Sequence, residues 1–170
     1  MSDKIYIFDT TLRDGAQTQG VDFSLDDKEK ISLALDNLGV DYIEGGWPGA
    51  NPTDTEFFNK KHTFKNSILT AFGMTKKSDH SAENDPMISS LINSKANSIC
   101  LFGKSWDFHV DVALGISKEQ NLKNISESAK HIINSGKEFM FDAEHFFDGY
   151  KSNKEYALNC IKSAYDQGAR

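Results

Sequence analysis

The sequence has 170 residues, a net charge of −6 and a pI near 5.3. That length suits a single domain with a sizeable hydrophobic core, and the acidic balance argues against a surface that binds nucleic acid. No apolar run is long enough to cross a membrane, and Met1-Ser2-Asp3-Lys4 lacks the apolar core of a signal peptide. We therefore expect a soluble cytoplasmic protein, in which Cys100 and Cys160 are buried free thiols.

Short apolar strands alternate with amphipathic helices along the chain. The expected strands are Ile5–Phe8, Tyr42–Ile43, Ile68–Phe72, Ser98–Phe102 and Phe139–Phe141. Two expected helices begin with residues in capping-box spacing, Ser24 with Asp27 and Ser117 with Gln120. Another helix is expected to begin near Thr53. Three glycines are expected to end helices: Gly39, Gly136 and Gly168. The expected inner faces are apolar: Ile31, Leu35 and Leu38; Met87, Ile88, Leu91 and Ile92; Leu122, Ile125, Ile132 and Ile133; Ala157, Leu158, Ile161 and Ala164.

Strict alternation of strands and helices predicts an α/β fold with parallel strands and right-handed crossovers. An open doubly wound sheet and a (β/α)8 barrel both fit that description. The first loop contains no Gly-x-Gly-x-x-Gly, which weakens the case for a dinucleotide-binding sheet. Polar residues follow the carboxyl end of every expected strand: Arg13-Asp14, Glu44, Thr75-Lys76-Lys77, Lys104-Ser105 and Glu144-His145. A barrel requires this clustering for its active site, but an open sheet also binds ligands at this edge. The barrel is therefore favoured, and the open sheet stays the alternative.

The segment from Phe8 to Gln17 reads Phe-Asp-Thr-Thr-Leu-Arg-Asp-Gly-Ala-Gln. A buried strand that opens into a polar pocket has this pattern. Arg13 and Asp14 would leave the strand together, as a fixed cation and a possible metal-ligating carboxylate. An ordinary salt bridge at the end of a strand is the structural alternative, and the pair alone does not decide between them.

This segment resembles the signature of the DRE-TIM metallolyases, which include isopropylmalate, homocitrate and citramalate synthases and hydroxymethylglutaryl-CoA lyase. Four further stretches are similar to the bacterial citramalate synthase branch: Tyr42 to Pro52, Ala71 to Thr75, Phe102 to Asp107, and Phe141 to Tyr150. The resemblance covers nearly the whole chain. It implies a TIM (β/α)8 barrel of which about five βα units are present.

The resemblance implies a Claisen-type condensation of acetyl-CoA with pyruvate, which gives (R)-citramalate and CoA in isoleucine biosynthesis. The family holds the keto acid on a divalent metal (Mg²⁺, Mn²⁺ or Zn²⁺), which polarises the ketone. The family's arginine corresponds to Arg13, which would stabilise the developing negative charge. Its metal-binding aspartate corresponds to Asp14. Gln17 fits a polar, substrate-binding position nearby.

Other candidates lie after the second, fourth and fifth strands. Glu144 is expected either to transfer a proton or to pair with Arg13, and both roles place it in the pocket. Glu44, beside two glycines, would orient the arginine or the ligand, or form a plain ion pair. His109 and His145 are weaker candidates for substrate contact, because a lone histidine is usually a hydrogen-bonded structural residue.

The sequence departs from the family in one respect. The family completes its metal site with a His-x-His motif on the seventh strand, and no such pair occurs among His62, His80, His109, His131 and His145. Five units cannot close a barrel that needs eight. Residues 1–170 are therefore expected to be the N-terminal portion of the catalytic barrel and to be inactive alone. The open sheet edges predict that the isolated chain either associates with another copy or fragment or is poorly stable. The intact enzyme is expected to be a dimer.

Three other functions remain open. The chain could belong to a 2-isopropylmalate or homocitrate synthase, which differ in the pocket for the keto acid's side chain. It could belong to a lyase of the hydroxymethylglutaryl-CoA type, which uses the same Arg-Asp site for cleavage. It could also be a non-catalytic subunit or fragment of such an enzyme, and the missing His-x-His motif favours that third function.

Overall fold

The computed structural model describes residues 4–170, so Met1–Asp3, used above in judging the signal peptide, lie outside the described residues. The strands are β1 Phe8–Asp9, β2 Tyr42–Gly46, β3 Ile68–Met74, β4 Ser98–Lys104 and β5 Glu138–Glu144. The α-helices are α1 Leu25–Leu38, α2 Pro52–Asn59, α3 Pro86–Asn93, α4 Asp107–His109, α5 Lys118–Asn134, α6 Phe146–Ser152 and α7 Lys154–Tyr165. Shorter helical turns are η1 Gly15–Gln17, η2 Ala82–Asn84 and the π-helical η3 Val110–Leu114.

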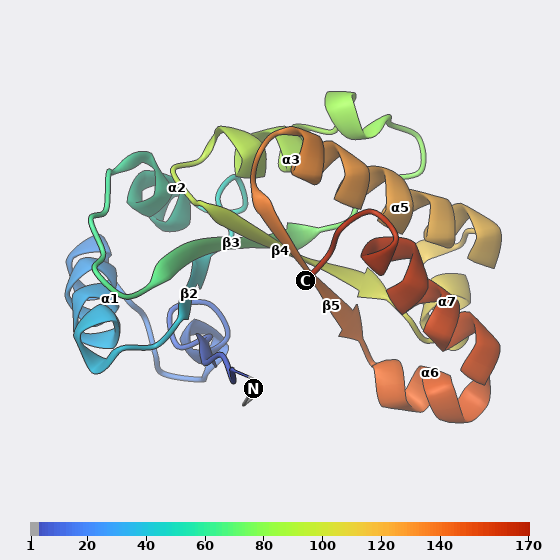
Figure 1. The fold of residues 1–170 in the computed structure, drawn as a ribbon, viewed down its shortest axis with the longest axis horizontal. Helices are drawn as coiled ribbons and strands as arrows, with labels where there is room; N and C mark the ends of the chain where they lie inside the picture. The colour runs from blue at the N-terminus through green and yellow to red at the C-terminus, as the bar shows by residue number, and fades with distance from the viewer. Residues whose placement is uncertain (1–3) are drawn as a thin grey trace. The chain divides into compact units, whose positions relative to one another are not determined.

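The strands follow one another in the sheet in chain order, β1-β2-β3-β4-β5 (Figure 1). β1 pairs with β2 in parallel, and β2 pairs with β3 in parallel. A doubly wound sheet would reverse the strand order at a switch point, and this order contains no reversal. The prediction of a barrel-type α/β fold is therefore confirmed over the described residues.

The described chain forms two compact units. The first unit runs to Phe72 and also includes Asn93–Ser98, and the second unit consists of Gly73–Ile92 and Ile99–Arg170. In the first unit, α1 packs beside α2, and α2 buries Phe57 and Phe58 completely. In the second unit, α5 and α7 lie side by side (Figure 1). Ile125 and Ile132 of α5 and Phe139 of β5 are fully buried in that unit.

The predicted first strand is too long. Only Phe8–Asp9 is a strand, and Ile5 is 82% exposed while Ile7 is 54% exposed. β1 is the end strand in the order of the sheet and pairs with β2. Apolar side chains on an edge segment remain open to solvent unless another element covers them. The apolar run therefore indicated a strand correctly but not its burial.

The predicted inner face of α1 is only partly correct. Ile31 and Leu35 are half-buried and Leu38 is 78% exposed, whereas the buried residues are Lys28, Ser32 and Asp36, spaced four apart. That spacing places them on one helix face, so α1 turns a polar stripe inward. Lys28 and Asp36 are buried there because each makes several hydrogen bonds to backbone groups.

The other helices follow the predictions more closely. Ser24 and Asp27 form a reciprocal capping box, and the hydroxyl of Ser117 accepts a hydrogen bond from the N–H of Gln120. Within the predicted inner faces the buried residues are Ile88, Leu91, Ile125, Ile132, Ala157 and Ala164, whereas Leu158 and Ile161 are exposed. Cys100 and Cys160 are buried free thiols, as predicted. Along residues 4–170 no helix has the length and apolarity that a membrane crossing requires.

Asp36 ties the end of α1 to the segment before β3. Its carboxylate accepts hydrogen bonds from the backbone N–H groups of Lys65, Asn66 and Ser67 at 3.0, 2.8 and 2.9 Å. Burial by itself would raise the pKa of Asp36, but these backbone hydrogen bonds outweigh it and leave the pKa lowered. The ionised form is therefore the one that stabilises the fold.

We expect Asp36→Asn to lower the free energy of unfolding by roughly 2 kcal/mol at pH 7, the scale for hydrogen bonds to a charged group. Because the folded-state pKa lies below the unfolded one, this stability is present above pH ~4 and is lost as pH falls through the folded-state pKa. The measurement is urea unfolding of both proteins from pH 7 to pH 3. Asp26→Asn, on the exposed first turn of the same helix, is the control and should change little. A difference that does not shrink at low pH would contradict this account.

Candidate functional site

In the loop after β1, three backbone N–H groups donate hydrogen bonds to one carbonyl oxygen. The backbone N–H groups of Arg13, Asp14 and Gly15 all point at the carbonyl oxygen of Thr10, at 3.1, 2.8 and 3.1 Å. Leu12 in this loop is completely buried and anchors it. The chain therefore leaves the strand as a compact turn that projects Arg13 and Asp14 together.

Arg13 is held on two sides. Its Nε donates to Oε2 of Glu44 at 2.6 Å, and its Nη1 donates to Oδ1 of Asp14 at 3.1 Å. The guanidinium carbon lies 3.9 Å from the centre of the Phe72 ring, a cation–π contact. Glu44 is almost fully buried, with 1% of its side chain exposed, against 18% for Arg13. The pair places a fixed cation at the carboxyl end of the sheet, with some of its N–H groups not used by these contacts.

Gln17 lies in η1 with its side chain exposed, and its backbone N–H donates to the carbonyl of Asp14 at 3.0 Å. The structure therefore brings Arg13, Asp14 and Glu44 together through side chains, while Gln17 joins them only through the backbone. Phe72 was not among the predicted site residues. Its place at the end of an expected strand was the available signal, because side chains there face the carboxyl edge.

The residues of this cluster do not by themselves fit a divalent metal ion. Over residues 4–170, no three side chains of the His, Cys, Asp or Glu type lie close enough together to hold one. Asp14 is 61% exposed and lies beside the Arg13 cation. One such carboxylate is a weak ligand for a hard divalent ion, which takes six or more oxygen ligands.

In the second unit, Glu144 forms an ion pair with Lys104. Lys104 ends β4 and Glu144 ends β5, and their side chains are 15% and 32% exposed. Ser105 fixes the two strand ends, because its hydroxyl donates to the carbonyl of Glu144 at 2.7 Å. The cation that pairs with Glu144 is thus Lys104, whereas the carboxylates paired with Arg13 are those of Glu44 and Asp14. Arg13 belongs to the first unit and Glu144 to the second, so the two roles expected for Glu144, proton transfer and pairing with Arg13, stay predictions.

His109 and His145 lie against each other and against Trp106. Their ring centres are 4.6 Å apart in an edge arrangement, and the His109 ring is 4.6 Å from that of Trp106. His145 has a left-handed backbone with φ 55°, uncommon for a non-glycine residue. Nδ1 of His109 is buried and has no hydrogen-bond partner within residues 4–170. The two weaker candidates thus form one aromatic cluster, held partly by ring packing.

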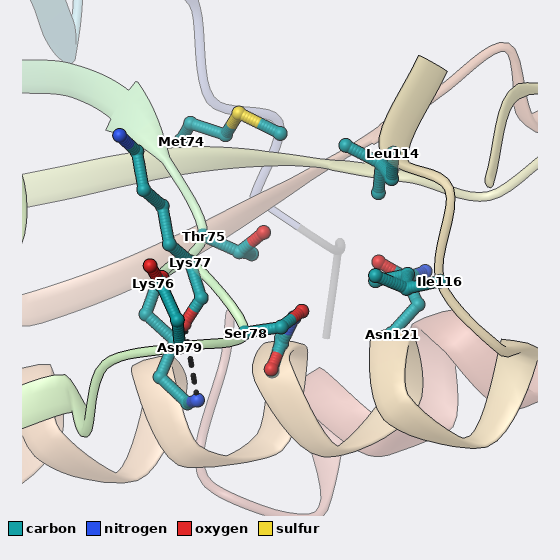
Figure 2. A pocket seen from close by; sticks show the side chains of 10 residues that line it. Met74, Thr75, Lys76, Lys77, Ser78, Asp79, Leu114, Ile116 and Asn121 are labelled. Atoms are coloured by element: carbon teal, nitrogen blue, oxygen red, sulfur yellow. Dashed lines mark hydrogen bonds between the residues drawn. The ribbon is translucent and has the colours of Figure 1, made fainter. Parts of the chain in front are cut away.

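A separate cavity of about 280 Å³ lies in the second unit, between the segment after β3 and the start of α5 (Figure 2). Met74, Leu114 and Ile116 give it an apolar lining, and Thr75 and Asn121 add polar groups. Thr75, Lys76 and Lys77, the polar residues expected after the third strand, belong to its lining, whereas Lys104 and Glu144 do not. Within the second unit, the cavity is therefore distinct from the Lys104–Glu144 pair.

Comparison with protein families matches the HMGL-like family over residues 4–170. The chain is 52% identical to an (R)-citramalate synthase of Aquifex aeolicus over 99% of its length. It is 48% identical to an (R)-citramalate synthase of Sulfolobus acidocaldarius over 97% of its length. A 2-isopropylmalate synthase of Sulfolobus acidocaldarius is more distant, at 32% identity. The chain spans 32% of the length of both citramalate synthases and 41% of the isopropylmalate synthase.

Solved structures of similar fold include hydroxymethylglutaryl-CoA lyases. The lyase of Pseudomonas aeruginosa aligns with a TM-score of 0.73 at 15% identity, over 98% of this chain and 55% of that chain. The lyase of Bacillus subtilis aligns with a TM-score of 0.71 at 17% identity, over 98% of this chain and 56% of that chain. At these identities the likeness shows the fold, which is part of a TIM barrel.

Proposed function

Because the chain belongs to the HMGL-like family, we propose that it supplies part of the active site of a citramalate synthase. This enzyme would join acetyl-CoA to pyruvate and release citramalate and CoA. The observation that carries the proposal is the pairing of Arg13 with the buried Glu44 at 2.6 Å. The high identity to citramalate synthases over nearly all of the chain supports the choice of reaction.

In this proposal Arg13 binds the keto acid and stabilises negative charge on its ketone oxygen. Carbon–carbon bond formation turns that oxygen into an alkoxide, and a preorganised cation is most effective where such charge develops. Glu44 holds the guanidinium in one orientation, so little reorganisation is needed when the charge appears. The ring of Phe72 supports the guanidinium from its face.

We assign proton transfer to Glu144. Its carboxylate would take a proton from the methyl group of acetyl-CoA, and the resulting carbanion-like carbon would attack the ketone carbon of pyruvate. Water would then cleave the thioester, which releases CoA as the thiol and leaves a carboxylate on the product. Lys104, paired with Glu144, holds the carboxylate in place through this sequence. Asp14 would supply at most one ligand to the metal that the resemblance implies, and the steps above use the chain's other side chains.

A 2-isopropylmalate synthase is the second candidate, because relatives with that name share 32% to 34% identity with the chain. The two enzymes differ in the size of the side chain on the keto acid, a methyl group in pyruvate and an isopropyl group in 2-oxoisovalerate. One extra methylene in a hydrophobic pocket changes the relative rates by about 10- to 200-fold, and an isopropyl group has two more carbons than a methyl group.

The test is thiol release from acetyl-CoA with each keto acid. We use an extended chain, defined as this sequence followed by the remaining residues of the Aquifex aeolicus citramalate synthase. We expect kcat/KM for pyruvate to exceed that for 2-oxoisovalerate by about 100-fold. The Aquifex enzyme itself is the positive control. A preference for 2-oxoisovalerate would favour the second candidate, and thiol release that needs no keto acid would contradict both.

A further inference from the structure

Lys28 is a buried lysine that lies apart from the residues assigned above to the reaction. It lies on α1, and only 4% of its side chain is exposed. Its Nζ donates to the carbonyl oxygens of Leu12 and Gly45 at 2.9 and 2.8 Å, and it forms an ion pair with Asp54. An ammonium group has three N–H donors, so these contacts account for all of them.

The two carbonyl groups belong to residues adjacent to the Arg13–Glu44 pair. Leu12 directly precedes Arg13, and Gly45 directly follows Glu44. We propose that Lys28 is a positioning residue, which fixes the loop after β1 against β2 so that Glu44 can hold the Arg13 guanidinium. The inference rests on the proposed function, because it gives Lys28 a role in orienting the cation of that reaction.

Asp54 is itself held rigidly. Besides Lys28, its carboxylate accepts hydrogen bonds from the backbone N–H of Trp47 at 2.8 Å and from Nδ2 of Asn51 at 2.9 Å. A Cβ on Gly46 would lie 2.5 Å from the Asp54 side chain, and Gly46 has φ 138°, so glycine is needed for this close approach. The ammonium group of Lys28 is therefore paired with a carboxylate on α2 whose position is itself fixed by hydrogen bonds.

Stability alone does not explain a buried ion pair at this place. Replacing such a pair with apolar side chains of similar volume is often neutral or stabilising. The three contacts of Lys28 instead join α1, α2, the loop after β1 and β2 around one atom. That geometry fixes the distance between two backbone segments, which an apolar side chain of the same size cannot do.

The first test uses the spectrum of the arginine side chains. The sequence contains two arginines, Arg13 and Arg170, so the Nε–H region of a ¹⁵N NMR spectrum shows two signals. In Lys28→Met we expect the Arg13 signal to move and its exchange with water to rise at least tenfold, while the Arg170 signal stays in place. Lys30→Met, on the exposed side of the same helix, should change neither signal.

Lys28→Met leaves Asp54 buried without its cation, which risks unfolding. The double variant Lys28→Met/Asp54→Asn removes both charges together and keeps the amide able to accept from Trp47. We expect the same movement of the Arg13 signal in this variant, with a dispersed spectrum that reports a folded chain. A folded variant in which the Arg13 Nε–H signal is unmoved would overturn the inference.

The second test measures thiol release by the extended chain carrying the same substitutions. We expect kcat to fall about 100-fold, the scale for a 1 Å misplacement of a catalytic group, and KM for acetyl-CoA to change less than threefold. Asp36→Asn is the control, because it destabilises the same unit and should leave kcat within threefold. If the Arg13 signal moves while kcat is unchanged, the positioning role is wrong. If the unsubstituted extended chain is inactive, the proposed function fails, and the spectrum still decides whether Lys28 positions Arg13.

Discussion

Replacing Arg13 with lysine in the extended chain is expected to lower kcat for thiol release with pyruvate by about a thousandfold. Lysine keeps the charge but loses the planar fork of donors, whose fixed directions let one group bond Glu44 and a ketone oxygen while it stacks on an aromatic ring. The contact between Nε and Glu44 at 2.6 Å and the stacking on Phe72 both depend on that planar group. The KM for acetyl-CoA should change little, because Arg13 is assigned to the keto acid.

Arg170→Lys is the matched control for this prediction. Arg170 also pairs with a glutamate, Glu138, at 2.7 Å, but it lies at the far end of β5 from Glu144. Its replacement should leave kcat within twofold of the unsubstituted enzyme. Equal losses in the two variants, or an Arg13→Lys enzyme that retains a tenth of the activity, would remove Arg13 from the chemistry.

Replacing Glu144 with glutamine is expected to lower kcat by about a thousandfold, within the range for general acid–base catalysis. The carboxamide has nearly the same shape but cannot accept a proton from the acetyl-CoA methyl group. Exchange of that methyl group's protons with deuterium from solvent should fall by the same factor, because exchange requires only the first step. Both quantities can be followed by proton NMR of one reaction mixture.

Glu138→Gln serves as the control on the same strand. Glu138 begins β5 and Glu144 ends it, and each is paired with a cation from another segment. Loss of an exposed pair such as Glu138–Arg170 has little effect on stability and none is expected on turnover. A Glu144→Gln enzyme with unchanged deuterium exchange would show that another group removes the methyl proton.

The fold could be predicted from the sequence because its signals are local. Alternating apolar strands and amphipathic helices, together with the capping residues Ser24 and Ser117, placed most elements correctly. Element limits were less predictable. The second strand was expected to end at Ile43, but Glu44, Gly45 and Gly46 continue β2, with a register shift between Glu44 and Gly46. A β-bulge of this kind depends on what packs beside the strand, here Asp54.

Candidate residues could be named from the sequence where a local pattern marks them, but their partners could not. Arg13 and Asp14 are adjacent, and Glu44 ends an apolar run, so all three were named as candidates, and the structure brings them together. Lys28 was missed because it is not one of the apolar residues expected on the inner face of α1, and a charged lysine on a helix is ordinarily exposed to solvent. Its burial depends on carbonyl groups of Leu12 and Gly45, which only the folded chain brings to it. Lys104 was seen as one polar residue after a strand, but its pairing with Glu144 required the neighbouring strand.

The measurement that tests the central claim most directly is the product formed from ¹³C-methyl acetyl-CoA and pyruvate by the extended chain. If Arg13 and Glu144 act as proposed, ¹³C NMR will show the label in a methylene carbon of citramalate, and Arg13→Lys will abolish that signal. If the folded extended chain forms no such carbon–carbon bond, while the Aquifex enzyme does so under the same conditions, this sequence does not supply the catalytic groups of a citramalate synthase.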